Sequence, residues 1–146
     1  MLLSDAILKG CEIRPQCYQS LIQAQFETQY PYELIGFRSC VIGAAYEGVF
    51  GKLPLTYDPI THGFESDEAY TTYDQLKTIF PILEEKFAIV IPGHPDCLSF
   101  EGEIRTHGLT LYTYLVCLND SRRWTREQIA AWVKYVVEGQ PMIPED

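Results

Sequence analysis

The chain has 146 residues, of which 47% are hydrophobic and 13% aromatic, and its formal net charge is −9. This length and composition fit one globular domain over residues 1–139 with a polar tail, 140–146, and exclude a disordered chain. The negative charge argues against a nonspecific nucleic-acid binder, which needs a basic face to displace the counterions of phosphates. No apolar run is long enough to cross a bilayer, so we expect no membrane association.

The first ten residues lack a basic region at their start and contain Asp5, so we expect no signal peptide and a cytoplasmic protein. The cysteines are odd in number and show no CxxC spacing. In a reducing compartment we expect them to be free, mostly buried thiols. They are Cys11, Cys17, Cys40, Cys97 and Cys117.

Two helices are expected at the start of the chain. Ser4 can cap a helix from residue 5 to about residue 9, and Gly10 can end it. Residues 17–26 carry apolar side chains at helical spacing, which favours a second helix. The segment 29–32 is expected to be a loop.

Residues 39–48 predict a closely packed helix. Ser39 can cap it, and Gly43, Ala44 and Ala45 leave its backbone almost bare. Glycine inside a helix costs about 1 kcal/mol relative to alanine, so Gly43 indicates a close approach by another element.

The middle of the chain is expected to be irregular. Residues 52–66 predict a long loop with room for a short hairpin. Thr71 or Thr72 can cap a following helix, after which Pro81 can begin a new turn or kink the helix. The apolar run 87–91 favours a short strand, although a buried helix end has the same pattern.

The clearest pattern is a helix start at Thr125. Gln128 completes a capping box with Thr125, and Trp124 with Ile129 fits a hydrophobic staple. Residues 109–118 are ambiguous, because their composition favours a strand while their place before a capped helix favours a helix–turn–helix arrangement.

Two segments resemble a family of small uncharacterised bacterial and phage proteins. Residues 39–48 are similar to that family's SCALGAA-like helix, and residues 118–133 to its C-terminal LND-x-x-x-WTREQIA-x-WV helix. Residues 3–7 and 14–16 also fit its start. The resemblance implies a mostly helical protein, favours a helix over residues 109–118, and implies no activity.

These patterns together predict a mainly α fold. We expect a small helical domain with a long irregular middle region that has room for a short β-hairpin.

A zinc site is one functional hypothesis. His94 and Cys97 are separated by two residues in a loop, the spacing of zinc-binding pairs, and His107 and Cys117 could complete four ligands. Some members of the similar family carry a CPxC pair at this place, from which His94 departs. A proline-stiffened turn with a core cysteine is the simpler interpretation, and otherwise no cofactor is expected.

A DNA-binding regulator with a helix–turn–helix-like C-terminus is a second hypothesis. Arg122, Arg123 and Arg126 gather at the start of the last helix, where a recognition helix would meet the major groove. The acidic composition opposes it, and a solvated turn with Asp120 or Glu127 as partner of Arg126 is the simpler interpretation.

Aromatic residues are dense between positions 30 and 73, as in a protein interface or a homodimer. The candidate interface residues are Tyr57, Phe64, Tyr70 and Tyr73. No arrangement of nucleophile, base or paired carboxylates identifies catalytic residues, so a non-enzymatic role is favoured. We therefore expect an interaction or regulatory module that self-associates as a homo-oligomer or binds a protein partner.

Overall fold

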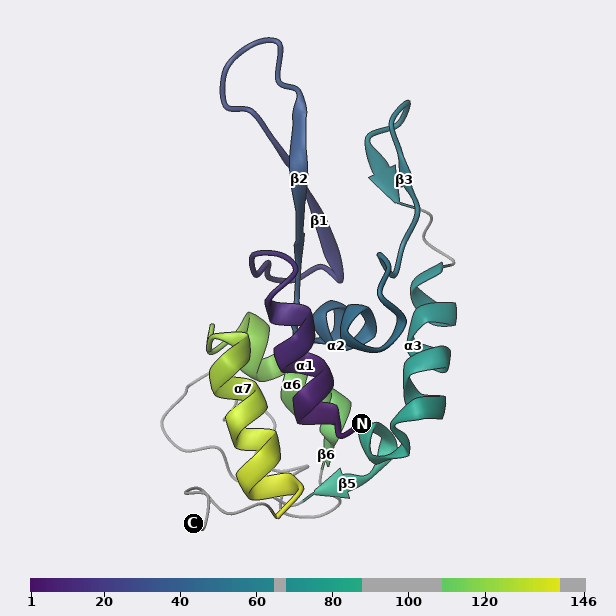
Figure 1. Cartoon of the computed structure of the whole chain (residues 1–146), viewed down its shortest axis with the longest axis vertical. Helices are drawn as coiled ribbons and strands as arrows, with labels where there is room; N and C mark the ends of the chain where they lie inside the picture. Colours follow the sequence, from purple (N-terminus) through teal and green to yellow (C-terminus); the bar gives the residue numbers. More distant parts are fainter. Residues whose placement is uncertain (65–67, 88–108, 140–146) are drawn as a thin grey trace.

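The computed structural model describes residues 1–64, 68–87 and 109–139 (Figure 1). Within these residues it contains five α-helices and three two-stranded antiparallel sheets. The expectation of a mainly α fold is therefore wrong, and the fold is mixed α/β. The main physical reason is that residues 22–39 form a paired hairpin, where the sequence pattern favoured a helix up to residue 26.

The helices are α1 (Leu3–Cys11), α2 (Val41–Phe50), α3 (Glu68–Ile79), α6 (Leu111–Asp120) and α7 (Arg126–Trp132), with a 3-10 turn η1 (Pro81–Glu84) and a π-helical turn η2 (Val133–Val137). The strands pair as β1 (Ile22–Phe26) with β2 (Leu34–Ser39), β3 (Tyr57–Asp58) with β4 (Gly63–Phe64), and β5 (Lys86–Phe87) with β6 (Leu109–Thr110). The short hairpin allowed for in residues 52–66 is thus present as β3–β4.

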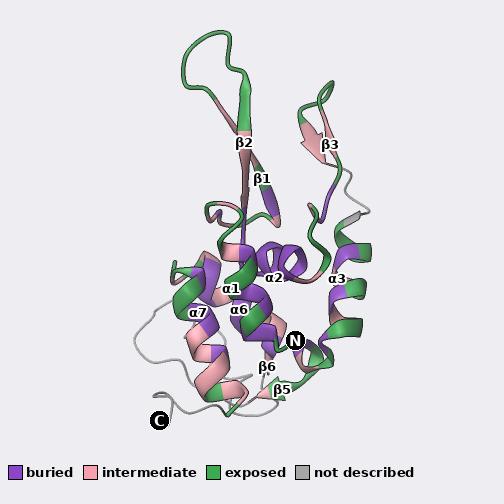
Figure 2. Cartoon of the chain, in the orientation of Figure 1, coloured by how far each residue is buried: buried purple, intermediate pink, exposed green. Residues whose placement is uncertain are grey.

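The helices form the core, and the first two hairpins extend away from it (Figures 1 and 2). Buried residues line the inward faces of α1, α2, α6 and α7, whereas the hairpins carry mostly half-buried and exposed residues. The core is therefore a helical layer that supports two projecting hairpins.

The helices α1 and α2 cross with their backbones in contact. A Cβ added to Gly10 would lie 1.8 Å from the carbonyl oxygen of Ala44, and one on Gly48 would lie 1.9 Å from that of Ala6. Only glycine leaves room for such an approach. The predicted packing role of Gly43 is confirmed as well, because its added Cβ would lie 2.6 Å from a backbone oxygen.

The start of α7 is as predicted. The backbone N–H of Thr125 donates to Oε1 of Gln128 at 2.9 Å, and the N–H of Gln128 donates to Oγ1 of Thr125 at 3.1 Å. Ile129 and Val133 are fully buried. The helix favoured over residues 109–118 is also confirmed, since α6 begins at Leu111 after a short strand.

The predicted helix over residues 17–26 is wrong. Gln19 has a φ of 63°, which interrupts a right-handed helix, and Ile22 then begins β1 opposite Ser39. The strand is stabilised by pairing with a segment that lies 8 to 17 positions further along the chain, which local periodicity does not reveal.

Three predicted caps are also placed differently. Ser4 lies inside α1, where its hydroxyl donates to Glu138 at 2.5 Å. Cys40 caps α2 in place of Ser39, whose hydroxyl serves another partner described below. Thr72 lies within α3 and donates to the carbonyl oxygen of Pro54 at 2.8 Å.

Pro81 begins the 3-10 turn η1, which confirms the prediction of a new turn rather than that of a kinked helix. Of the strand expected over residues 87–91 only Phe87 is described, and the irregular region 93–108 and the tail 140–146 lie outside the described residues. In the part of the chain that the structure describes, no helix combines the length and apolarity needed to cross a membrane.

Candidate functional site

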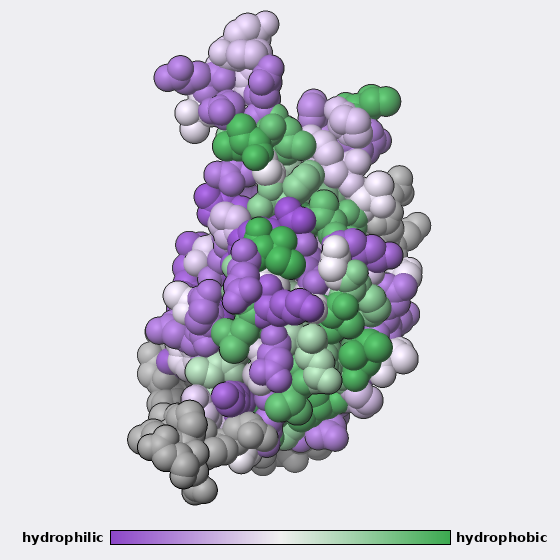
Figure 3. Space-filling view, in the orientation of Figure 1, coloured by the Kyte–Doolittle hydropathy of each residue, from purple (hydrophilic) through white to green (hydrophobic). Residues whose placement is uncertain are grey.

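Exposed apolar side chains gather on the two projecting hairpins. Five large ones lie there with exposed fractions of 39% to 88%. Figure 3 shows hydrophobic residues below the hydrophilic tip of the β1–β2 hairpin and at the end of the β3–β4 hairpin. We call this set the hairpin surface. It consists of Tyr30, Tyr32, Leu34, Ile35 and Ile60.

An aromatic cluster joins the two hairpins beneath this surface. The ring of Phe37 on β2 lies 5.3 Å from that of Tyr57 and 6.1 Å from that of Phe64, and the latter two rings are 5.6 Å apart. Such tilted and edge-on contacts stabilise the packing beyond the burial of apolar area. The predicted interface residues Tyr57 and Phe64 are thus brought together, but as half-buried support for the surface.

The tip of the β3–β4 hairpin is shaped by Asp58. Its carboxylate accepts from the N–H of Ile60 at 2.9 Å, and its carbonyl oxygen accepts from the N–H of His62 at 2.8 Å. This turn leaves Ile60 almost fully exposed. The ring of His62 lies within hydrogen-bond distance of the Tyr57 hydroxyl, with 2.9 Å between Nδ1 and the oxygen.

A shallow hollow lies between the hairpins at this level. Phe26, Tyr32 and His62 line it, and its volume is about 410 Å³. The ring of His62 meets that of Phe26 edge-on at 5.7 Å. The hollow is open and apolar, so it is suited to receive a side chain of a partner.

The other two predicted interface residues lie elsewhere, on α3. Tyr70 is 78% exposed there. The ring of Tyr73 packs 4.4 Å from that of Tyr112, and its hydroxyl donates to Glu84. Burial raises the pKa of Tyr73, and the carboxylate of Glu84 raises it further. The four predicted residues therefore belong to two separate places.

The three arginines proposed for DNA binding are largely occupied within the chain. The guanidinium of Arg126 is buried, and its Nη1 donates to Oγ of Ser39 at 2.7 Å while Nη2 donates to the carbonyl oxygen of Arg14. Arg122 stacks over Trp124 at 4.9 Å from the ring centre. Arg123 is exposed and lies over a tyrosine ring on the surface.

These contacts correct the expected partner of Arg126. A carboxylate of Asp120 or Glu127 was expected, but the guanidinium bonds to a hydroxyl and to backbone carbonyls of the segment below β2. Its buried position leaves it unavailable to a phosphate in this fold. DNA binding stays a prediction that rests on the remaining arginines.

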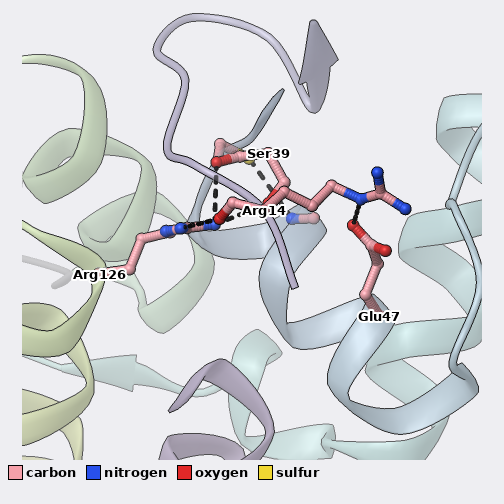
Figure 4. A network of polar contacts seen from close by, with 6 residues as sticks. Arg14, Ser39, Glu47 and Arg126 are labelled. Carbon is pink, nitrogen blue, oxygen red and sulfur yellow. Dashed lines mark hydrogen bonds and ion pairs between the residues drawn. The ribbon is translucent and has the colours of Figure 1, made fainter. Parts of the chain in front are cut away.

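A buried polar network holds the base of β2 (Figure 4). Besides Arg126 and Ser39, it contains an ion pair in which Nε of Arg14 lies 2.6 Å from Oε1 of Glu47, a residue that is 1% exposed on α2. A buried charge requires such a partner. The network fixes where the β1–β2 hairpin leaves the helices.

Asn119 extends this network to α6. Its amide nitrogen donates to the carbonyl oxygen of Cys17 at 3.0 Å, and its oxygen accepts from Gln16 at 2.9 Å and from the N–H of Val41 at 3.1 Å. It thereby satisfies an otherwise unpaired donor at the start of α2. The motifs at residues 39–48 and 118–133 thus meet, and their polar residues act as structural anchors.

The described free cysteines are poor nucleophiles. Burial raises the pKa of the Cys11 and Cys17 thiols to about 12 and that of Cys40 to about 11. A thiol with so high a pKa carries almost no thiolate near neutral pH. Cys117 is disulfide-bonded, so the expectation that every cysteine is a free thiol is wrong for Cys117.

The proposed zinc ligands His94, Cys97 and His107 lie outside the described residues. Among the residues that the structure describes, no three metal-binding side chains gather at one place. The zinc hypothesis stays a prediction, and Cys117 could serve as a ligand only after reduction.

Sequence reasoning missed the five residues of the hairpin surface as a set. Tyr30 and Tyr32 belong to the aromatic-rich region that it noted, but Leu34, Ile35 and Ile60 are ordinary aliphatic residues. Recognising the β1–β2 pairing would have revealed a projecting hairpin.

Comparison with models of known protein families, with curated proteins and with solved structures finds no match.

Proposed function

We propose that this chain is a non-enzymatic interaction module that associates with itself through the hairpin surface. The observation that supports the proposal most directly is the gathering of five exposed apolar side chains on two neighbouring hairpins. Fully burying one such side chain contributes about 1.5–3 kcal/mol, so covering several of them favours association.

The support beneath the surface reduces the cost of binding. The aromatic cluster of Phe37, Tyr57 and Phe64 ties the hairpins together, and the polar network fixes the base of β2. A surface that is held in place before binding loses less conformational entropy when a partner covers it.

Its composition also fits an interface. Tyrosines present a large area with few rotatable bonds, and they are enriched among residues that dominate binding energy. Tyr30 and Tyr32 are 85% and 60% exposed, and their rings meet edge-on at 6.0 Å. None of the five residues is itself charged.

Sedimentation velocity over a range of concentrations tests the proposal. We expect the wild-type chain to form a dimer or larger species, and the double variant Ile35→Ser, Ile60→Ser to dissociate at roughly 100-fold higher concentration, since about 3 kcal/mol of burial is lost. Both side chains are exposed, so the fold should persist.

The matched control is Tyr70→Ser, which removes another exposed apolar side chain, 78% exposed, from α3. It should leave the association unchanged. A wild-type chain that stays monomeric at every concentration would overturn the proposal. Dissociation by Tyr70→Ser but not by the double variant would place the interface on α3 instead.

A further inference from the structure

The pairing of β1 with β2 determines which backbone groups point outward. The carbonyl oxygen of Leu21 accepts from the N–H of Cys40 at 3.1 Å, so these residues form a hydrogen-bonded pair. Hydrogen-bonded and non-hydrogen-bonded pairs alternate along an antiparallel ladder. Ala24, which faces Phe37, is therefore in a non-hydrogen-bonded pair, and its N–H and C=O point away from β2.

The same alternation holds at both ends of β1. Ile22 faces Ser39, whose N–H and C=O bond outward to Pro15 and Cys17, as the alternation requires. Phe26 precedes Glu27, whose N–H donates inward to the carbonyl oxygen of Glu33 at 2.8 Å. Residues 22, 24 and 26 thus present a row of backbone donors and acceptors along the outer edge of β1.

The outer edge of β2 is protected, in contrast to that of β1. At its base, Ser39 donates to the carbonyl oxygen of Pro15 and accepts from the N–H of Cys17, both at 2.9 Å. Further up, the register shifts so that Ile35 is an extra, bulged residue. Covering segments and bulges are the usual means of blocking an edge strand.

No such protection is present on β1. Its sequence, Ile22–Phe26, contains no charge and no proline. Among the described residues, nothing bonds to the outward backbone groups of Ala24. Figure 1 shows the hairpin extending beyond the helices, and along β1 Ile22 is buried at the base while Ala24 and Phe26 are half-buried. An edge of this kind is a template for a further strand.

The side chains of β1 fit a second copy of the same strand. If Ala24 faces Ala24 of a second copy in an antiparallel pair, Ile22 faces Phe26 and Gln23 faces Gln25. One face of the pair is then entirely apolar, and on the other face glutamine amides can bond to each other. The residue chemistry is the same in both directions, as a two-fold symmetric contact requires.

We propose that β1 pairs antiparallel with β1 of a second copy across a two-fold axis at Ala24. The two hairpins then form one four-stranded sheet in the order β2, β1, β1, β2, joined by about six backbone hydrogen bonds. This inference rests on the proposed self-association and specifies its mode. It predicts that the backbone contributes to the interface together with the hairpin surface.

The variant Ala24→Pro tests this mode. Proline removes the outward N–H and places its ring at the edge, but removes no hydrogen bond between β1 and β2. We expect it to raise the dissociation constant of the dimer by roughly 100-fold, as measured by sedimentation velocity. The control is Gly36→Ala in the same hairpin, where an added Cβ meets no atom within 4 Å, and its association should be unchanged.

Amide hydrogen exchange of the wild-type chain, resolved by residue, tests the pairing without any substitution. We expect the N–H of Ala24 to exchange slowly at concentrations that give dimer and rapidly after dilution. The N–H groups of Gln23 and Gln25, which bond to β2, should be slow in both cases.

The outcomes separate the two proposals. A monomeric wild-type chain overturns both of them. A dimer in which Ala24 exchanges rapidly, or one that Ala24→Pro leaves intact while the hairpin-surface variant dissociates, overturns the edge pairing and leaves the proposed function standing.

Discussion

Gly48→Ala tests the backbone contact between α1 and α2. The added methyl group would lie 1.9 Å from the carbonyl oxygen of Ala6, whereas ordinary contacts of a Cβ begin near 3.4 Å. The neighbouring atoms belong to backbone, so no side chain can rotate away. The two helices would have to separate by about 1.5 Å at the crossing.

Two opposing effects determine how much Gly48→Ala changes the free energy of unfolding. Replacing glycine by alanine inside a helix stabilises the folded state by about 1 kcal/mol when nothing else intervenes. Overfilling a packed core costs about 1–3 kcal/mol, and more where backbone must move. Separation would also loosen the contacts of Ile7 and Val41, which are fully buried on the two helices.

We therefore expect the free energy of unfolding to fall by about 2 kcal/mol, with a decrease in Tm of roughly 4–8 °C. Urea unfolding followed by circular dichroism measures it. Gly36→Ala is the control, because its methyl group would enter open space, and it should be neutral or stabilise by up to about 1 kcal/mol. A Gly48→Ala variant as stable as wild type, or more so, would refute the close crossing.

Two further substitutions and a pH series test the interior. Arg126→Met leaves the hydroxyl of Ser39 and nearby carbonyls without their donor. The free energy of unfolding, measured in urea, should therefore fall by about 2–4 kcal/mol. Arg123→Met, at an exposed site, is the control and should change it by less than about 0.5 kcal/mol. Equal effects of the two would contradict the buried network. For the thiols, burial raises the pKa of Cys17 from its ordinary 9.0 to about 12. The unfolded chain releases this proton first, so stability is complete below pH 9 and should fall as pH rises toward 12. The urea midpoint of the wild-type chain should decline from pH 8 to pH 11, and that of Cys17→Ser should decline less. If the midpoints of both chains fell equally with pH, this thiol would not contribute to the pH dependence of stability.

Local chemistry explains what the sequence predicted well. The capping box of Thr125 and Gln128 depends only on residues three positions apart, and it forms as expected. Gly43 indicated a close approach because glycine inside a helix is unfavourable unless packing requires it. Such features need no knowledge of distant partners.

Features set by distant pairing were not predictable in this way. The apolar spacing in residues 17–26 fits a helix or a strand, and only the pairing with β2 decides between them. The same limit applies to the site. Tyr57 and Phe64 meet because β3 pairs with β4, and Phe37 reaches both because two hairpins lie side by side. Tyr73 on α3 packs instead against Tyr112 on α6.

Arg126 shows the same limit for charged residues. Its position in the first turn of α7 suggested a solvated or DNA-binding arginine, but the nearby backbone below β2 encloses it. The carbonyl group of Arg14 lies more than a hundred residues away in the chain, so the residues near Arg126 in sequence could not identify it as a partner.

The anchoring of β2 by Arg126 has a consequence for the order of synthesis. The guanidinium bonds to Ser39 across 87 positions of sequence and to Arg14 across 112, and Ser4 meets Glu138 across 134. Contacts of such separation form late, because much chain must be ordered before they are made. On the ribosome, the N-terminal helices and the first hairpin emerge long before the arginine that fastens them. A nascent chain paused before residue 126 thus displays the first hairpin without the arginine that anchors its base.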